Sequence, residues 1–324
     1  MDTFVPIQTL DVEAEKQITF DLFVHLPLNQ KYILYRRKGG QIEQNRFEKI
    51  IEGSVNNFFI RQDDYKTFVK YVAGRLQGLI GTECTEQTVR MMSSSTRALL
   101  ASTLQQKDTA MVRVLMENLK DITGVIIESV MERSQIGSKI SFQKMVELSN
   151  KGTDFHKHPV NVASLAVLLT MGIGYNTDRI LSEVAMAALL HDVGLAHMPT
   201  HIIARSHSPL ELSISDRRLL YEHPKHSLEL LKARRVKMSP MIETMILQHH
   251  EYYNGGGYPK GLRGFQINEF SQILLVADEM DQVIAGPIET NRELKYKISA
   301  LFDQYNRELT IEPTLLSRIR SVIL

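Results

Sequence analysis

The residues whose types and spacing could perform chemistry are concentrated in one part of the chain. Of the eleven histidines, all except His25 lie between His156 and His250. The stretch HHEYYNGGGYPKGLRG opens with His249 and His250 and runs directly into three glycines, a tyrosine and a proline. Neighbouring residues of a helix point about 100° apart, so two adjacent imidazoles cannot both face one apolar core. Either one of the two is solvent-exposed and has no function, or both lie at a helix end and point toward the same group.

Other side chains that bind metals stand beside the expected helix boundaries of the same region. These are His158 near the start of one helix, His191 and Asp192 at the end of the next, His223 at the end of a third, and Asp278 after the apolar run ILLVA. One histidine at a helix C-terminus usually interacts only with the helix dipole. Several at successive helix ends of a bundle can meet, and imidazole and carboxylate ligands without thiolate suit iron, manganese or zinc in an open catalytic site. Asp192, with histidines on both sides, indicates a dinuclear centre.

The elements that must position these residues are predicted to be helices. After about residue 150 apolar periodic segments alternate with Gly, Pro and Asn loops, so the pattern predicts an all-α bundle over 150–324. Thr177 as N-cap and Gly194 as stop should bound one helix. Ser213, three residues before Asp216, should begin another.

The first part of the chain shows a different pattern. Residues 1–83 are predicted to form a small α/β domain with strands at 20–27, 31–37 and 56–62, which makes the whole chain α+β. We interpret this domain as regulatory or partner-binding, with a purely structural cap as an equal alternative. Residues 84–149 should form a helical linker, in which 110–134 carries an apolar face. That helix is expected to pack on its own domain, although it could instead connect a sensor to its output or pair two copies as a homodimer.

Composition excludes several classes of protein. The 324 residues carry a formal net charge of +1, so a partner such as a nucleic acid polymer or an anionic membrane is not expected. The one cysteine, Cys84, can form no internal disulfide, which fits a reducing compartment. The N-terminal residues have no signal-peptide pattern, and the longest apolar stretch is too short to span a bilayer. A cytoplasmic protein is therefore expected.

In their order along the chain, the motifs resemble a known family. HDVG, then HP at 223, then HHEYYNGGGYPKGL, then VADEMD are similar to the signature of the HD-GYP domain, a subset of the HD-domain metal-dependent phosphohydrolases. The resemblance covers roughly residues 150 to 285. It implies an all-α bundle with two or three metal ions, often iron, that hydrolyses the bacterial second messenger cyclic di-GMP. A cyclic dinucleotide is then the expected ligand, and a diguanylate cyclase or another signalling protein the expected partner.

The resemblance also implies roles for individual residues. It implies metal ligation by His158, His191, Asp192, His223, His249, His250 and Asp278, with Asp192 bridging two divalent ions, iron being favoured over manganese. A metal-bridging hydroxide would attack the phosphodiester, with Asp192 and Tyr258 as catalytic residues. Gly257, Tyr258 and Pro259 would lie beside the substrate, where glycine lets backbone approach a ligand. Asp154 matches a third-metal ligand, but Pro159 suits a helix start and so favours two metals over three.

Several positions depart from the family pattern. Leu195 stands where the family has a lysine, Asn254 where it has aspartate, and Ser227 where it has glycine. The run QVIAGPIETNREL replaces a segment whose arginine contacts the ligand, and the region between Pro199 and Leu212 is longer than usual. Three functions therefore stay open. An active cyclic dinucleotide phosphodiesterase is favoured over a module that binds the messenger with little turnover, and over a hydrolase of another phosphorylated nucleotide.

Overall fold

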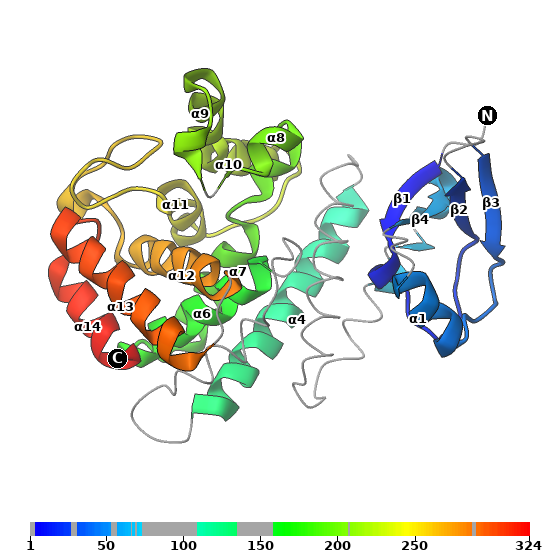
Figure 1. Ribbon diagram of the computed structural model, residues 1–324, viewed down its shortest axis with the longest axis horizontal. Helices are drawn as coiled ribbons and strands as arrows, with labels where there is room; N and C mark the ends of the chain where they lie inside the picture. Colours follow the sequence, from blue (N-terminus) through cyan, green and yellow to red (C-terminus); the bar gives the residue numbers. More distant parts are fainter. Residues whose placement is uncertain are drawn as a thin grey trace. The chain divides into compact units, whose positions relative to one another are not determined.

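The computed structural model describes residues 4–26, 31–52, 57–65, 67–68, 70–72, 109–134, 158–206, 208–286 and 290–324. Most of the predicted linker over 84–149 and the predicted ligand Asp154 lie outside these ranges. Contacts divide the chain into two compact units, Met1–Asn118 and Leu119–Leu324. Each unit is described by itself (Figure 1). The domain boundaries proposed from the sequence, at residues 83 and 149, stay predictions.

The first unit contains a four-stranded antiparallel sheet with the order β1-β4-β2-β3. Its elements are β1 (Phe4–Gln8), β2 (Leu22–Leu26), β3 (Lys31–Arg36), α1 (Gln44–Glu52) and β4 (Asn57–Arg61). In β4, Phe58 and Ile60 are buried whereas Asn57 and Arg61 are exposed, which is the two-residue alternation of a strand with one buried face. The three strands predicted from the sequence are confirmed, and β1 is an additional strand.

The long helix α4 (Thr109–Ser134) follows in the chain and passes through the boundary between the units. Leu119, Ile122, Ile126 and Val130 are buried, at the spacing of three and four residues that predicted an apolar face. Among the residues that the structure describes, no helix is both long enough and apolar enough to cross a lipid bilayer.

The second unit is a helical bundle built around α6, as predicted. Its helices are α6 (His158–Gly172), α7 (Asp178–Leu190), α8 (Thr200–Ile203), α9 (Ile214–Tyr221), α10 (His223–Ala233), α11 (Pro240–Gln248), α12 (Glu269–Ala285), α13 (Asn291–Glu308) and α14 (Pro313–Ile323). Every residue of α6 from Val160 to Thr170 is buried. This helix packs against α7, α12 and α14, which surround it in Figure 1. A helix that is apolar all round must lie in the core, and α6 does.

The predicted helix boundaries are partly correct. Ser213 caps α9, because its Oγ accepts a hydrogen bond from the backbone N–H of Asp216 at 3.1 Å. Thr177 precedes α7, although its side chain makes no capping hydrogen bond. Gly194 does not stop α7, which ends at Leu190. A Cβ at Gly194 would lie 2.5 Å from the carbonyl oxygen of His223, so this glycine allows close packing against the start of α10.

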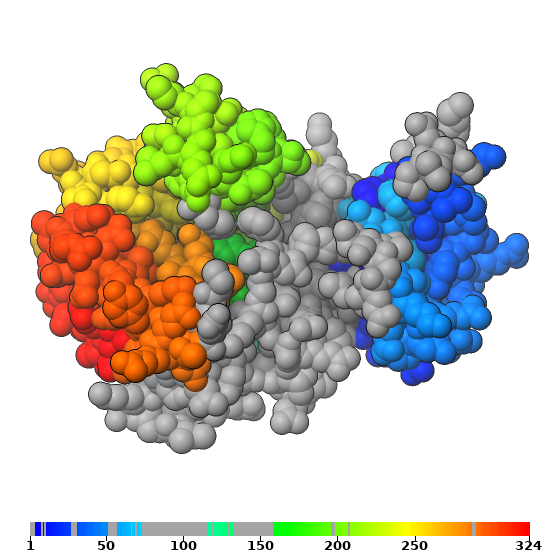
Figure 2. All heavy atoms as spheres, in the orientation of Figure 1, coloured from blue at the N-terminus to red at the C-terminus, as the bar shows by residue number. Residues whose placement is uncertain are grey.

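Residues 199–222 form a lobe that projects from the bundle. They contain α8, a 3-10 turn at Pro209–Glu211 and α9, and they stand out as the green mass in Figure 2. A small apolar cluster holds this lobe together, made of Met198, Ile202, Leu212 and Leu220, with Leu195 packed against it. The extra length between Pro199 and Leu212 is thus folded around a core of its own.

Candidate metal centre

Six of the seven predicted ligands lie where helices of the second unit begin or end. His191 directly follows the last residue of α7, and His249 and His250 directly follow the last residue of α11. His158 is the first residue of α6, as expected from Pro159 in the next position. The two histidines that open the glycine-rich stretch are therefore at a helix end.

The prediction that His223 closes a helix is wrong. The preceding helix, α9, ends at Tyr221, and His223 is the first residue of α10. Pro224 supplies the reason, because proline is favoured in the first turn of a helix, where its missing N–H leaves no hydrogen bond unmade. Asp278 also differs from the other ligands, since it lies within α12 and faces the core at 2% exposure.

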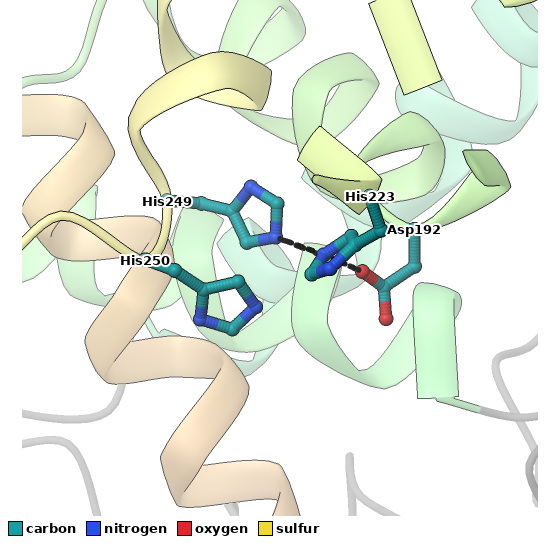
Figure 3. A group of neighbouring side chains, drawn as sticks. All are labelled: Asp192, His223, His249 and His250. Atoms are coloured by element: carbon teal, nitrogen blue, oxygen red, sulfur yellow. Dashed lines mark hydrogen bonds and ion pairs between the residues drawn. The ribbon is translucent and has the colours of Figure 1, made fainter. Parts of the chain in front are cut away.

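Asp192 lies between two groups of histidines. Its Oδ1 atom is 3.1 Å from Nε2 of His223 and 3.6 Å from Nε2 of His249 (Figure 3). Its Oδ2 atom is 3.5 Å from Nε2 of His191 and 3.8 Å from Nε2 of His158. One carboxylate thus turns one oxygen toward each group, which is the geometry that a bridging ligand requires.

The surrounding ligand atoms form two sets that share this carboxylate. The α6–α7 group is His158, His191 and Asp192, and the α10–α11 group is Asp192, His223, His249 and His250. Within each group one potential ligand atom per residue lies within 4.8 Å of the others. Asp278 joins the first group, with its Oδ1 atom 3.2 Å from Nε2 of His158. All seven predicted ligands are therefore brought together, whereas Asp154 lies outside the described residues.

Backbone carbonyls fix the tautomers of three imidazoles. The Nδ1–H groups of His191, His223 and His249 donate to the carbonyls three residues earlier, at 2.7, 2.8 and 2.6 Å. Each neutral ring therefore turns the lone pair of Nε2 toward Asp192. Two such lone pairs, on His223 and His249, lie only 3.2 Å apart. With both Nδ1–H groups donating to carbonyls, this contact is favourable when a cation, either a proton or a metal ion, lies between the two Nε2 atoms.

The His191 ring gives a second indication that a cation fits here. Its Nε2 atom is buried and has no hydrogen-bond partner in the part of the chain that the structure describes. Burial lowers the pKa of His191 and, more strongly, the pKa of His250, so both rings stay neutral and keep their lone pairs at neutral pH. An unprotonated ring nitrogen can bind a metal ion, whereas it gains nothing by facing the unprotonated nitrogen of another imidazole.

The carboxylates supply the negative charge. Burial alone would raise the pKa of Asp192, but the surrounding imidazoles outweigh it and hold this pKa well below its usual range. Burial likewise opposes ionisation of Asp278, and its contact with His158 lowers the pKa nonetheless. Two ionised carboxylates beside these imidazoles offer negative charge to divalent cations. The donor set is nitrogen and oxygen, so it fits the ions proposed from the sequence.

The glycine-rich loop is folded back onto the end of α11. The backbone N–H of Tyr258 donates to the carbonyl of His250 at 2.9 Å, and the Glu251 carboxylate accepts from the backbone N–H groups of Lys260 and Leu262. A Cβ at Gly257 would lie 2.3 Å from the carbonyl oxygen of His250. The chain's own backbone therefore demands glycine at position 257.

A pocket of about 270 Å³ opens beside the metal centre. Its floor includes Asp192, His223, His250 and Asp278, and its walls include Tyr221, Tyr252, Tyr258, Gly256 and, from beside and within the lobe, Leu195, Ser206 and Pro209. Tyr258 stacks on Tyr221 at 4.1 Å and on His250 at 4.7 Å between ring centres. Of the three residues predicted to lie beside the substrate, Tyr258 lines this pocket, whereas Gly257 and Pro259 are not among its described lining residues.

Two departures from the family pattern have a structural reason. Asn254 accepts a hydrogen bond from the backbone N–H of Gly256 and donates another to the carbonyl of Glu308, both at 2.6 Å. An ionised aspartate could not make the second bond. Ser227 is buried, and its hydroxyl accepts from the N–H of Gly194 and donates to the carbonyl of His191. Both side chains therefore support the site from outside it.

Sequence reasoning missed two polar residues next to His158. Asp281 is buried and its Oδ2 atom lies 2.8 Å from Nδ1 of His158, while the side chain of Asn161 donates to Asp281 at 3.0 Å. Both lie three residues after a predicted ligand, Asn161 after His158 and Asp281 after Asp278. Polar residues on the ligand-bearing face of otherwise apolar helices were the signal that could have found them.

Comparisons with known proteins agree with this geometry. A family model described as an HD domain matches residues 147–311. The chain is 30% identical over 166 residues to the cyclic di-GMP phosphodiesterase response regulator RpfG of Xanthomonas campestris, an alignment that covers 51% of this chain and 42% of that protein. It is also 30% identical over 122 residues to the 3'3'-cGAMP-specific phosphodiesterase 1 of Vibrio cholerae, covering 38% of this chain and 27% of that protein. The chain thus spans less than half the length of these relatives.

A solved structure shares the fold. An HDG"Y"P protein from Bdellovibrio bacteriovorus superposes with a TM-score of 0.66, and the match covers 99% of both chains at 18% sequence identity. At that identity the likeness establishes the fold alone.

Proposed function

This chain belongs to the HD domain family, and from that premise we propose that it is a metal-dependent phosphodiesterase that hydrolyses a cyclic dinucleotide, with cyclic di-GMP as the first substrate to test. The observation that carries the proposal is the position of Asp192, whose two oxygens face different groups of buried imidazoles. The curated relatives support the substrate class, because their names specify cyclic di-GMP or 3'3'-cGAMP.

We assign the seven ligands to two cation positions, with iron favoured and manganese as the alternative. His158, His191 and Asp278 would hold one ion, His223, His249 and His250 would hold the other, and Asp192 would be shared by both. Bound there, two divalent cations would supply a hydroxide nucleophile at neutral pH and neutralise charge on the phosphodiester. The backbone carbonyls behind the imidazoles keep each ring in the tautomer that ligation needs.

Tyr258 is assigned to the substrate. It lines the pocket beside His250, and its burial raises the pKa of the phenol well above its usual value, so the hydroxyl keeps its proton at neutral pH. A protonated phenol in this position donates a hydrogen bond to a phosphate oxygen. Stacking against Tyr221 and His250 fixes the ring plane, so the hydroxyl needs little reorganisation when a ligand enters.

The pocket suits one end of the dinucleotide. Its volume of about 270 Å³ is below that of most pockets that enclose a whole drug-sized ligand, which are roughly 300–1,000 Å³. We infer that one phosphodiester and its neighbouring nucleoside enter beside the cations, and that the rest of the ring stays outside.

A module that binds the messenger with little turnover is the second candidate. Leu195 favours it, because this side chain lines the pocket and packs against the apolar cluster of the lobe, where the family lysine would place a charge. An alkyl side chain gives no proton to a departing oxygen and no positive charge to a phosphate.

A turnover assay distinguishes these functions. Protein loaded with iron or manganese should convert cyclic di-GMP or 3'3'-cGAMP to a linear product, and Asp192→Ala should not. Asp303→Asn, which removes a carboxylate paired with Arg320 on another part of the bundle, is the matched control and should retain activity. Tight binding without turnover would support the receptor function, and turnover of linear nucleotides alone would support a different nucleotide hydrolase.

A further inference from the structure

Asp281 is a buried carboxylate that the ligand assignment leaves without a role. It lies in α12, one turn after Asp278, and is 3% exposed. The helices that meet around it, α6 and α12, bury mostly apolar side chains there. Burying an ionised carboxylate carries a large desolvation cost, so a position like this one calls for a specific contact that needs the charge.

The contact is with His158. The Oδ2 atom of Asp281 accepts a hydrogen bond from Nδ1 of His158 at 2.8 Å. The Oδ1 atom accepts from the side-chain amide of Asn161, one turn along α6, at 3.0 Å. Asn161 thereby holds the carboxylate in place, and the carboxylate sets the plane of the imidazole so that Nε2 points toward Asp278 and Asp192.

His158 differs in this respect from three of the other imidazoles. His191, His223 and His249 each use Nδ1–H to reach a backbone carbonyl three residues earlier. His158 is the first residue of α6, so α6 has no earlier turn whose carbonyl could serve, and a carboxylate takes that place. A carbonyl is neutral, whereas a carboxylate is negatively charged and makes the imidazole a stronger base.

We propose that Asp281 is a positioning residue that makes the two cation positions unequal, so that the position formed by His158, His191, Asp192 and Asp278 binds its ion more tightly than the position formed by Asp192, His223, His249 and His250. This inference rests on the proposed function. Three carboxylates lie around the first position, Asp192 and Asp278 as ligands and Asp281 behind His158. The second position has the shared Asp192 and three imidazoles.

The test is a titration of metal-free protein with Mn²⁺, followed by calorimetry. The wild-type protein should bind two ions in two steps of different affinity. Asp281→Asn keeps the size of the side chain and one acceptor oxygen but removes the charge. It should weaken the tighter step about 10- to 100-fold and leave the weaker step unchanged. Asp303→Asn again serves as the matched control, and both of its steps should equal those of the wild type.

A second variant protects the test against misfolding of Asp281→Asn. Asn161→Ala removes the amide that orients Asp281 and leaves the carboxylate in place, so it should weaken the same step by a smaller factor. Unchanged affinities in a folded Asp281→Asn protein, or two indistinguishable steps in the wild type, would overturn the inference while the two-ion centre stands. A wild-type protein that binds no Mn²⁺ and shows no turnover would instead remove the proposed function itself.

Discussion

Asp192 connects both proposed cation positions, because its two oxygens face different groups of imidazoles. Replacing it with alanine should therefore remove metal from both positions. We expect elemental analysis of Asp192→Ala, purified without chelator, to show less than about a tenth of the wild-type metal. Asp216→Ala removes a carboxylate from the lobe and should keep wild-type metal content. Stoichiometric metal in Asp192→Ala would show that the bridging assignment is wrong.

Tyr258 should act on the substrate and not on the metal. Tyr258→Phe keeps the ring that stacks on Tyr221 and His250 and removes only the hydroxyl. Loss of a hydrogen bond to a charged phosphate costs about 1.5–3 kcal/mol, so kcat/KM should fall about 10- to 100-fold while metal content stays constant. Metal lost together with the hydroxyl would mean that the phenol supports the centre itself.

The candidate ligands could be predicted from the sequence, but the hydrogen bonds that support them could not. Motif order and helix boundaries are local patterns, and the seven residues that they singled out lie close together in the structure. The amide of Asn254 donates to the carbonyl of Glu308, which is 54 positions later in the chain. Asp281 meets His158 across 123 positions. Such hydrogen bonds depend on packing: a sequence can mark Asp281 as a polar residue on a ligand-bearing face, but it does not pair this residue with His158.

The loop after α11 is positioned by close backbone contact. A Cβ at Gly257 would meet the carbonyl oxygen of His250 and the backbone nitrogen of Tyr252, both at 2.3 Å. Gly257→Ala should therefore push the loop away from the helix end, destabilise the second unit by about 1–3 kcal/mol and displace His250.

Chemical denaturation and Mn²⁺ titration measure these two effects of Gly257→Ala. The weaker cation position, which includes His250, should lose affinity. Gly124→Ala is the matched control, because a Cβ at this helical position meets nothing within 4 Å, and it should be neutral or slightly stabilising. Wild-type stability in Gly257→Ala would contradict the backbone role assigned to this glycine.

Leu195 links the lobe to the pocket. Because it packs on the apolar cluster of the lobe and also lines the pocket, a lysine there can keep its alkyl stem against the cluster and extend its ammonium toward a phosphate. Leu195→Lys should raise kcat on cyclic di-GMP by about tenfold or more, since one well-placed donor contributes at least that much. Leu195→Met should have wild-type kcat. No gain in the lysine variant would show that the missing cation does not limit turnover.

Elements were predicted where their signals were local. The strand β1 was missed because Pro6 interrupts its pattern, yet it lies at an edge of the sheet, where proline is tolerated. His223 was assigned to the end of a helix because the break between α9 and α10 is a single residue, Glu222. Apart from α9, the lobe escaped prediction because its four-residue helix and its 3-10 turn are too short to show a period.

The whole molecule consists of two units, and the proposed cations involve the second alone. All seven proposed ligands lie in Leu119–Leu324, and none lies in Met1–Asn118. Ions that bind the folded state stabilise it by about 2.7 kcal/mol when their free concentration is a hundred times the dissociation constant. Removing them with a chelator should lower the midpoint of the second unit's thermal transition by several degrees.

Calorimetric scans with and without chelator measure this effect. The thermal transition of the first unit should stay at the same temperature with chelator. Added Mn²⁺ should return the transition of the second unit to its original temperature. Equal shifts of both transitions, or no shift at all, would argue against cations confined to the bundle.

Anomalous diffraction from crystals of Mn²⁺-loaded protein tests the bridging role of Asp192 most directly. Data collected at the manganese absorption edge should show two peaks for each chain, one on either side of the Asp192 carboxylate, with His158 beside one peak and His223 beside the other. A single peak, or peaks that do not contact Asp192, would contradict the two-cation centre.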